Sequence, residues 1–130
     1  MRPADGSTTM THPHRALLET ANAEMAAGNP QGFIDHCADD IRWEMVGEET
    51  IVGKDAVLAW ARKTYAVAPP AFSADHWIIE GDWLAVRGEI TVQDAERGAV
   101  HSKYCDLWRI EGGKLAELRA FAIEESKPES

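Results

Sequence analysis

An aspartate lies among aromatic residues near the carboxyl end of the chain. Residues 104–108 read YCDLW, and strand alternation places Tyr104, Asp106 and Trp108 on one face. Because a charged carboxyl group strongly prefers water, we interpret this face as the wall of a cavity rather than as solid core. A neutral Asp106 could donate a hydrogen bond to a ligand carbonyl there, and its carboxylate could remove a proton beside one.

Two further side chains are candidates to act with Asp106. Tyr104, two residues earlier on the same face, is its expected hydrogen-bond partner. His76 precedes Trp77 and could face the same cavity, although the phase of its strand leaves this open. Burial should raise the pKa of Asp106 unless a cation or hydrogen-bond donors offset the effect. The alternative is a structural aspartate satisfied by the backbone or by a helix terminus.

Other polar residues are weaker candidates for chemistry. Glu44 is expected on the outer face of its strand, and His101 on the surface or at an interface. Tyr65 either caps the mouth of the cavity or serves packing. The HPH run at residues 12–14 lies in a segment expected to fray, and its spacing is poor for a metal site. We therefore predict neither a metal nor a cofactor.

Composition limits the class of protein. A chain of 130 residues is long enough for one domain with its own core. Its net charge of −9 disfavours nucleic acid and anionic membranes as partners. No apolar run approaches the roughly 20 residues that cross a bilayer, and the opening segment lacks the apolar core of a secretion signal. Cys37 and Cys105 have no metal or redox spacing, which suits reduced thiols in a cytoplasmic protein.

The periodicity of apolar residues predicts helices first and strands afterwards. The first half contains a helix from a Thr11 cap to Gly28, a short helix opened by Asn29 and Pro30, a strand over 41–46 and a helix over 52–66. The second half contains strands over 71–80, 83–94, 99–111 and 114–125. We therefore predict an α+β domain over residues 12–125, between a flexible tail at 1–11 and a frayed end at 126–130.

Small residues on the last strand favour a hollow on the inner face of the sheet. One face carries Ala116, Leu118, Ala120 and Ala122, and the other carries Leu115, Glu117, Arg119, Phe121 and Ile123. Since interiors are normally close-packed, several small inward residues leave room for a ligand unless large tryptophans fill the gap. The predicted ligand-binding residues are Trp43, Met45, Met25, Trp60, Val86, Gly88, Trp108, Leu118 and Ala120.

The outer face of the same sheet combines apolar residues with charges of both signs. Cys105, Leu107, Phe121 and Ile123 alternate along the strands with Arg87, Glu89, Arg109, Glu117 and Arg119. Such a surface suits a two-fold interface better than open water, so a homodimer is expected.

The order of motifs is similar to that of a known superfamily. The segments GNPQGFIDHCADDIRWEMVG, VGKDAVLAW and YCDLWRIEGGKLAELRAFA resemble the cone-shaped NTF2-like superfamily, and within it SnoaL-like polyketide cyclases and ketosteroid-isomerase-like proteins. The resemblance implies three N-terminal helices packed on a strongly curved, mixed or antiparallel sheet, an apolar pocket and a dimer through the convex face. Asp106 matches the oxyanion-hole acid of ketosteroid isomerase and an aspartate of the acid/base set of limonene epoxide hydrolase.

Four positions depart from those enzymes. The proton-shuttling aspartate of the isomerase falls at Met45, and its oxyanion tyrosine falls at Ala21. The arginine of the hydrolase falls at Tyr104, and its second aspartate falls at Ala120. The resemblance therefore carries over the fold but neither reaction.

Three functions are compatible with the sequence. The first is an enzyme that performs cofactor-independent acid/base chemistry of the isomerase, cyclase, dehydratase or hydrolase type on a small hydrophobic metabolite, led by Asp106. The second is a binder of a hydrophobic small molecule without turnover, which the missing acid at Met45 favours. The third is a dimeric interaction domain of this fold.

Overall fold

Three helices and six strands make up the part of the chain that the structure, a computed structural model, describes, residues 11–125. In order they are α1 (Pro13–Ala26), α2 (Pro30–Ile34), β2 (Cys37–Met45), β3 (Glu49–Val52), α3 (Lys54–Thr64), β4 (Ala71–Glu80), β5 (Trp83–Asp94), β6 (Gly98–Glu111) and β7 (Lys114–Glu124). The predicted α+β class is confirmed. The predicted tail at 1–11, apart from Thr11, and the predicted end at 126–130 lie outside the described residues.

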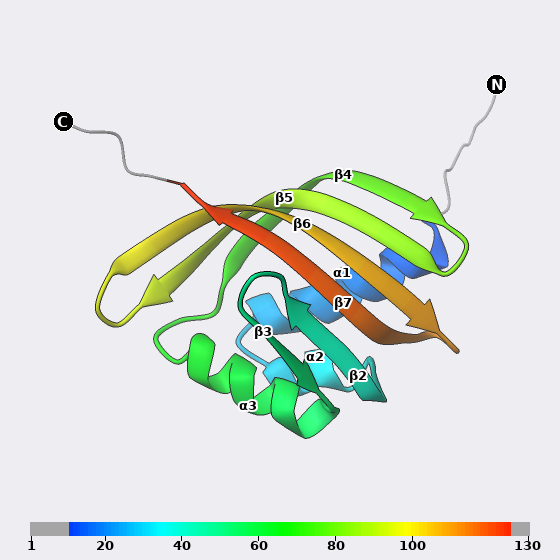
Figure 1. Ribbon diagram of the computed structural model, residues 1–130, viewed down its shortest axis with the longest axis horizontal. Helices are drawn as coiled ribbons and strands as arrows, with labels where there is room; N and C mark the ends of the chain where they lie inside the picture. Colours follow the sequence, from blue (N-terminus) through cyan, green and yellow to red (C-terminus); the bar gives the residue numbers. More distant parts are fainter. Residues whose placement is uncertain (1–10, 126–130) are drawn as a thin grey trace.

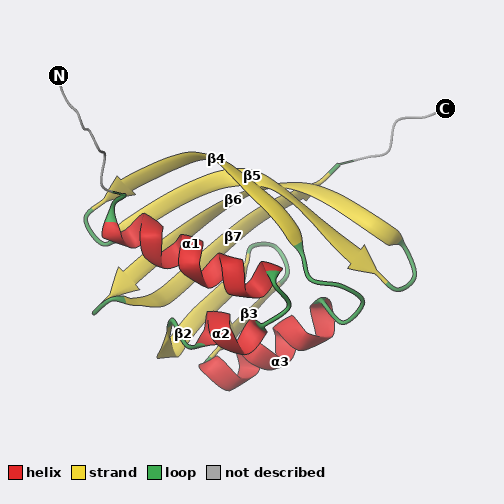
Figure 2. Ribbon diagram, turned by 180° about the vertical axis from the view of Figure 1, so that it is seen from behind, coloured by secondary structure: helices red, strands yellow, loops and turns green. Residues whose placement is uncertain are grey.

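The strands form one mixed sheet in the order β3-β2-β7-β6-β5-β4. Strands β4 to β7 are an antiparallel meander, whereas β2 joins it parallel to β7. The sheet arches over the helices, so that α1, α2 and α3 all lie on its concave side (Figures 1 and 2). Side chains on that side are therefore enclosed between two layers, while no helix of residues 11–125 covers the convex side.

Local chemistry explains where the first two helices begin. Asn29 caps α2 as predicted, with its Oδ1 3.3 Å from the Gly32 amide, and Pro30 is the first helical residue. The predicted Thr11 cap of α1 is wrong, because His12 is the cap and its Nδ1 accepts a hydrogen bond from the His14 amide. The 12–14 segment is not frayed either, since the His14 ring bonds the carbonyl of Gly81 at 3.0 Å.

Strand β3 was not predicted from the sequence. It is only four residues long and lies at the edge of the sheet, paired with β2 alone. Its residues are mostly exposed, so that no alternation of apolar and polar side chains reveals it. Its partner β2 also starts earlier than the predicted strand, at Cys37 rather than Ile41.

Part of the core lies between α2 and strands β2, β6 and β7. Trp43 is the centre of an aromatic cluster, with its ring 5.8 Å from that of Phe33 and 5.7 Å from that of Trp108, both edge-on. Leu115 is completely buried here, which corrects its predicted place on the outer face. A bulge at Ala116 shifts the register between β6 and β7, so that residues on either side of it change faces.

None of the helices in the described range 11–125 is both long and apolar enough to span a lipid bilayer.

Candidate functional site

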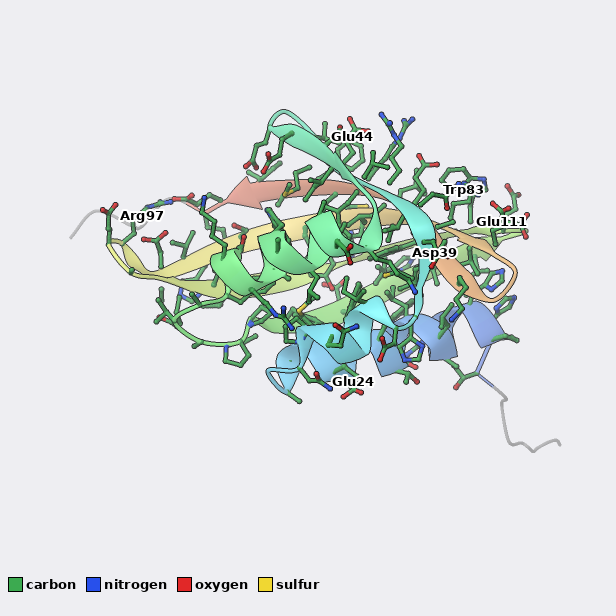
Figure 3. The ribbon with its side chains drawn as sticks, turned by 90° about the horizontal axis from the view of Figure 1, so that it is seen from below. Glu24, Asp39, Glu44, Trp83, Arg97 and Glu111 are labelled. Atoms are coloured by element: carbon green, nitrogen blue, oxygen red, sulfur yellow. The ribbon has the colours of Figure 1, made fainter. Side chains whose placement is uncertain are left out.

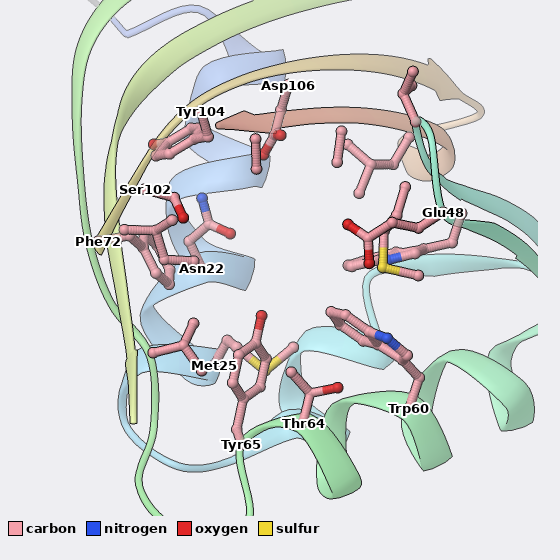
Figure 4. Close-up of a pocket in the computed structure, with 18 of the residues that line it drawn as sticks. Asn22, Met25, Glu48, Trp60, Thr64, Tyr65, Phe72, Ser102, Tyr104 and Asp106 are labelled. Carbon is pink, nitrogen blue, oxygen red and sulfur yellow. The ribbon is translucent and has the colours of Figure 1, made fainter. Parts of the chain in front are cut away.

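A cavity of about 380 Å³ opens between the concave face of the sheet and helices α1 and α3 (Figure 4). Most of the side chains around it are apolar or aromatic, and a few polar groups point into it, which is the usual composition of a small-molecule site. Its lining residues are Asn22, Met25, Trp43, Met45, Val46, Glu48, Trp60, Thr64, Tyr65, Phe72, Val86, Ile90, Val92, Ser102, Tyr104, Asp106, Leu118, Ala120 and Ala122.

The hollow arises because inward side chains on β7 become smaller along the strand. At one level of the sheet Leu118 lies between Trp43 and Trp108, and these three large side chains fill the space. One level further, Ala120 lies between Met45 and Asp106. A methyl group replaces an isobutyl group there, and the enclosed volume is left open.

Asp106 projects from β6 into this hollow (Figure 4). Its side chain is half-buried, and within residues 11–125 no side chain or backbone amide donates a hydrogen bond to it. Burial without compensation raises the pKa of Asp106 from its ordinary 3.8 to about 7. The group can therefore be neutral or charged near physiological pH, which suits a proton donor or acceptor.

Tyr104 was predicted to form a hydrogen bond with Asp106, but it does not. Its ring lines the cavity, but its hydroxyl donates to the backbone carbonyl of Ser73 on β4 at 2.8 Å. Burial, followed by the negative charges of Asp106 and Asp75, raises the pKa of Tyr104 to about 12. Tyr104 is therefore a neutral phenol that ties β4 to β6, with its oxygen lone pairs still able to accept a hydrogen bond.

Gly88 does not line the cavity, contrary to the prediction. A Cβ atom at this position would lie 1.8 Å from the carbonyl oxygen of Ser73 and 2.9 Å from the Tyr104 hydroxyl. The glycine thus makes room for the backbone of β4 rather than for a ligand.

His76, which the sequence allowed to face the cavity, lies outside it. A bulge at Asp75 leaves Ala74 opposite Gly88 but His76 opposite Arg87, so the strand changes phase between them. Trp77 consequently turns inward, and His76 is exposed on the other side of the sheet.

The other predicted lining residues divide into two groups. Trp108 is buried in the aromatic cluster behind the cavity and does not line it. The remaining seven do line it: Met25, Trp43, Met45, Trp60, Val86, Leu118 and Ala120.

Several polar lining residues were not found from the sequence. Asn22 lies one turn from Met25 and Leu18 on α1, so a polar residue on a buried helix face was its available signal. Glu48 sits in the turn between β2 and β3, where no periodicity indicates direction. Thr64 and Ser102 complete the set.

Tyr65 is more than a packing residue, because its hydroxyl points into the cavity (Figure 4). Its ring stands edge-on to Trp60 with centroids 5.7 Å apart, and Trp60 in turn contacts Trp43. Burial, together with the nearby charge of Asp106, raises the pKa of Tyr65 well above its usual value. The contacts from Trp43 through Trp60 to Tyr65 therefore hold the neutral hydroxyl of Tyr65 across the cavity from Asp106.

The lining contains no lysine, arginine or histidine in the part of the chain that the structure describes. Among residues 11–125, the carboxyl groups that line the cavity are those of Asp106 and Glu48. Across residues 11–125, no three His, Cys, Asp or Glu side chains cluster closely enough to hold a metal ion. The site is thus apolar with an acidic character.

Solved structures share this architecture. A putative ketosteroid isomerase from Kribbella flavida is 18% identical, with 91% of this chain and 83% of that chain covered and a TM-score of 0.73. An LEH-like epoxide hydrolase from M. tuberculosis is 13% identical, with 85% and 83% covered and a TM-score of 0.76. An NTF2-like protein of unknown function from Burkholderia pseudomallei is 19% identical, with 85% and 90% covered and a TM-score of 0.76. At these identities the likeness shows the fold alone, which is NTF2-like as predicted.

Sequence comparison places the chain more narrowly. No curated protein matches it significantly. The family model of the SnoaL-like domain matches residues 18–118, which include Asp106 and all of the cavity-lining residues except Ala120 and Ala122. The chain therefore belongs to the SnoaL-like domain family.

Proposed function

We propose that the protein is a small enzyme that performs acid/base chemistry, without a cofactor, on a small uncharged hydrophobic metabolite. One observation carries the proposal: Asp106 is a half-buried carboxyl group without a hydrogen-bond partner in residues 11–125, on the wall of a largely apolar cavity. Proteins rarely leave a carboxyl group in such a place, and those that do commonly use it on a ligand. The cavity volume lies within the range of known small-molecule sites.

A binding protein without turnover is the second candidate. It is favoured by Met45 and Ala120, the neighbours of Asp106 across the sheet, neither of which can transfer a proton. The same cavity would then retain a hydrophobic molecule, with Asp106 as the polar group that orients it.

Binding of 2-naphthol, a neutral bicyclic phenol, tests the role of Asp106. We expect the native protein to bind it at pH 6 and Asp106→Asn to bind it at least about 10-fold more weakly, because a neutral acid is a stronger donor to the phenol oxygen than an amide. Asp82→Asn, which changes an exposed carboxylate in the β4–β5 turn, is the matched control. Equal affinities for the three proteins, measured by fluorescence titration, would remove Asp106 from the site.

The natural ligand can be sought in parallel by mass spectrometry of the gently purified native protein. A co-purified neutral hydrophobic molecule, lost from Asp106→Asn but not from Asp82→Asn, would support the proposed site. A molecule retained by both variants would contradict it. Accumulation of a converted product on incubation would separate the enzyme from the binder.

We propose that the convex face of the sheet forms a homodimer. Phe121, Ile123 and Ile78 are 45%, 76% and 60% exposed there, although all three are large and apolar. Trp83 and Glu44 lie on the outside of the sheet with them (Figure 3), and Arg119 pairs with Glu44 at 3.6 Å. Apolar residues rimmed by ion pairs are typical of protein interfaces. Light scattering at micromolar concentration should give twice the monomer mass, and a monomer would contradict this proposal.

A further inference from the structure

We propose that Glu48 is the base that exchanges protons with a substrate whose oxygen is held by Asp106, and that the substrate is an uncharged carbonyl compound. This inference rests on the proposed function and assigns the second proton-transfer group that Met45 cannot supply.

The β2–β3 turn holds Glu48 at the cavity. Its backbone amide donates to the Met45 carbonyl at 2.9 Å, and Gly47 adopts the positive φ of 86° that the turn requires. The amide of Val46 donates to the carbonyl of Ala120 at 3.0 Å, and Ala120 is the direct partner of Asp106 on the next strand. The turn is thus fixed to the strand beside Asp106.

The side chain of Glu48 points from this turn into the hollow (Figure 4). No hydrogen bond or ion pair engages its carboxylate within residues 11–125. Glu44, on the same strand pair, shows the contrast, because it faces outward and pairs with Arg119. An unpaired carboxylate aimed into a cavity is free to act on what the cavity holds.

The two cavity carboxyl groups have different surroundings. Asp106 is half-buried among apolar side chains, which favours its neutral form. Glu48 is exposed at the rim, where water stabilises its charge. The other titratable side chains facing them are Tyr65 and Tyr104, both neutral phenols, and no basic residue lines the described cavity. Two carboxyl groups in such different surroundings can divide the roles of acid and base.

The step that this arrangement supports is enolisation. The Glu48 carboxylate takes a proton from the carbon next to the carbonyl, so that a C–H bond breaks and an O–H bond forms on Glu48. The electron pair of the C–H bond becomes the C=C bond of the enolate, and the carbonyl π electrons move to oxygen. The O–H of Asp106 stabilises that oxygen by a hydrogen bond. Return of a proton from Glu48 to the same carbon, or to another, completes exchange or isomerisation.

Charge identifies the class of substrate. An anion would meet two carboxyl groups and no cation in the described cavity, so anionic metabolites are disfavoured. The aromatic and aliphatic walls instead suit an uncharged ring system with one carbonyl group.

Hydrogen–deuterium exchange of 2-tetralone provides the test. This neutral bicyclic ketone has acidic protons beside its carbonyl, and NMR in D₂O follows their replacement. We expect the native protein to accelerate exchange and Glu48→Gln to lose about 100-fold of that acceleration, the usual contribution of a general base. Glu49→Gln, which changes the exposed neighbour outside the cavity, should exchange like the native protein. Glu48→Gln should still bind 2-naphthol within about 3-fold of native, because binding does not require the base.

The pH dependence separates a base from a structural residue. The native rate should fall above pH 7 as Asp106 loses its proton, and Glu48→Gln should show little of this pH-dependent acceleration. Exchange by Glu48→Gln within about 3-fold of the native rate, or no acceleration by the native protein, would overturn the inference. If Asp106→Asn weakens 2-naphthol binding while Glu48→Gln exchanges normally, only the assignment of Glu48 fails. If Asp106→Asn binds normally, the proposed function fails.

Discussion

The two ends of the concave face are built from the same strands, but large side chains fill one end and small side chains leave the other open. At the closed end, Trp108 and Leu118 from neighbouring strands meet Trp43 and Phe33, and the space is filled. One level along the same strands, Asp106 and Ala120 leave a cavity of about 380 Å³. Well-packed aromatic side chains at one end can supply the free energy of folding that an uncompensated acid at the other end costs. The difference shows how a small domain can keep an open cavity and remain folded.

The aromatic cluster at the closed end is expected to carry much of the stability of the domain. Trp108→Ala should lower the free energy of unfolding by about 3–5 kcal/mol, because it removes a buried indole from a close-packed cluster. Trp108→Phe should cost much less than Trp108→Ala, since the indole nitrogen of Trp108 has no hydrogen-bond partner within residues 11–125. Urea unfolding at constant pH measures both variants. A loss below about 1 kcal/mol for Trp108→Ala would show that the closed end is not the stabilising region.

At the open end, the stability effect depends on pH. The pKa of Asp106 is about 7 in the folded protein and near 3.8 when unfolded, so the folded state binds more protons between these values. Stability from this group is therefore complete below pH 4 and is lost as the pH rises through 7. Asp106→Asn should remove this loss and make the protein more stable than native at pH 8, by about 2–4 kcal/mol.

Urea unfolding from pH 4 to pH 8 checks this expectation. The native protein should lose stability over the range, and the curve of Asp106→Asn should be flatter. Asp82→Asn should follow the native curve, because its carboxyl group is exposed. Parallel native and Asp106→Asn curves would mean that Asp106 is solvated like a surface acid, and the contrast between the two ends would disappear.

Regular alternation made much of this site predictable from the sequence. The inward direction of Asp106 follows from the regular alternation of β6, a long strand in unbroken register with β5. The inward direction of Ala120 follows in the same way from the alternation of β7, in which Ala120 pairs with Asp106. Two bulges account for two of the errors, because a single extra residue at Asp75 or Ala116 puts the alternation on its two sides out of phase. His76 and Leu115 were misplaced for this reason. The sequence contains no local signal for either bulge.

Residues whose role depends on distant backbone were beyond prediction for a different reason. Gly88 reads as an empty inward position, but the carbonyl of Ser73 occupies the space that its side chain would need. The sequence indicates only that Glu48 is a turn residue. The pairing of β2 with β7, which the hydrogen bond from Val46 to Ala120 continues, brings that turn beside Asp106. Both depend on how separate strands meet, which composition and periodicity do not encode.

Adding a leucine side chain at Ala120, beside the cavity, and at Ala21, in the packed core, tests directly whether the space beside Asp106 is open. Ala120→Leu should change the free energy of unfolding by less than about 1 kcal/mol, because the added carbons enter the cavity rather than a packed interior. Ala21→Leu adds the same carbons at a fully buried position of α1, where overpacking should cost about 1–3 kcal/mol. Ala120→Leu should nevertheless abolish 2-naphthol binding, since the new side chain occupies the space beside Asp106. Urea unfolding and fluorescence titration measure the two effects on the same samples. If Ala120→Leu were as destabilising as Ala21→Leu, Ala120 would be as closely packed as Ala21, and the proposed ligand space beside Asp106 would not exist.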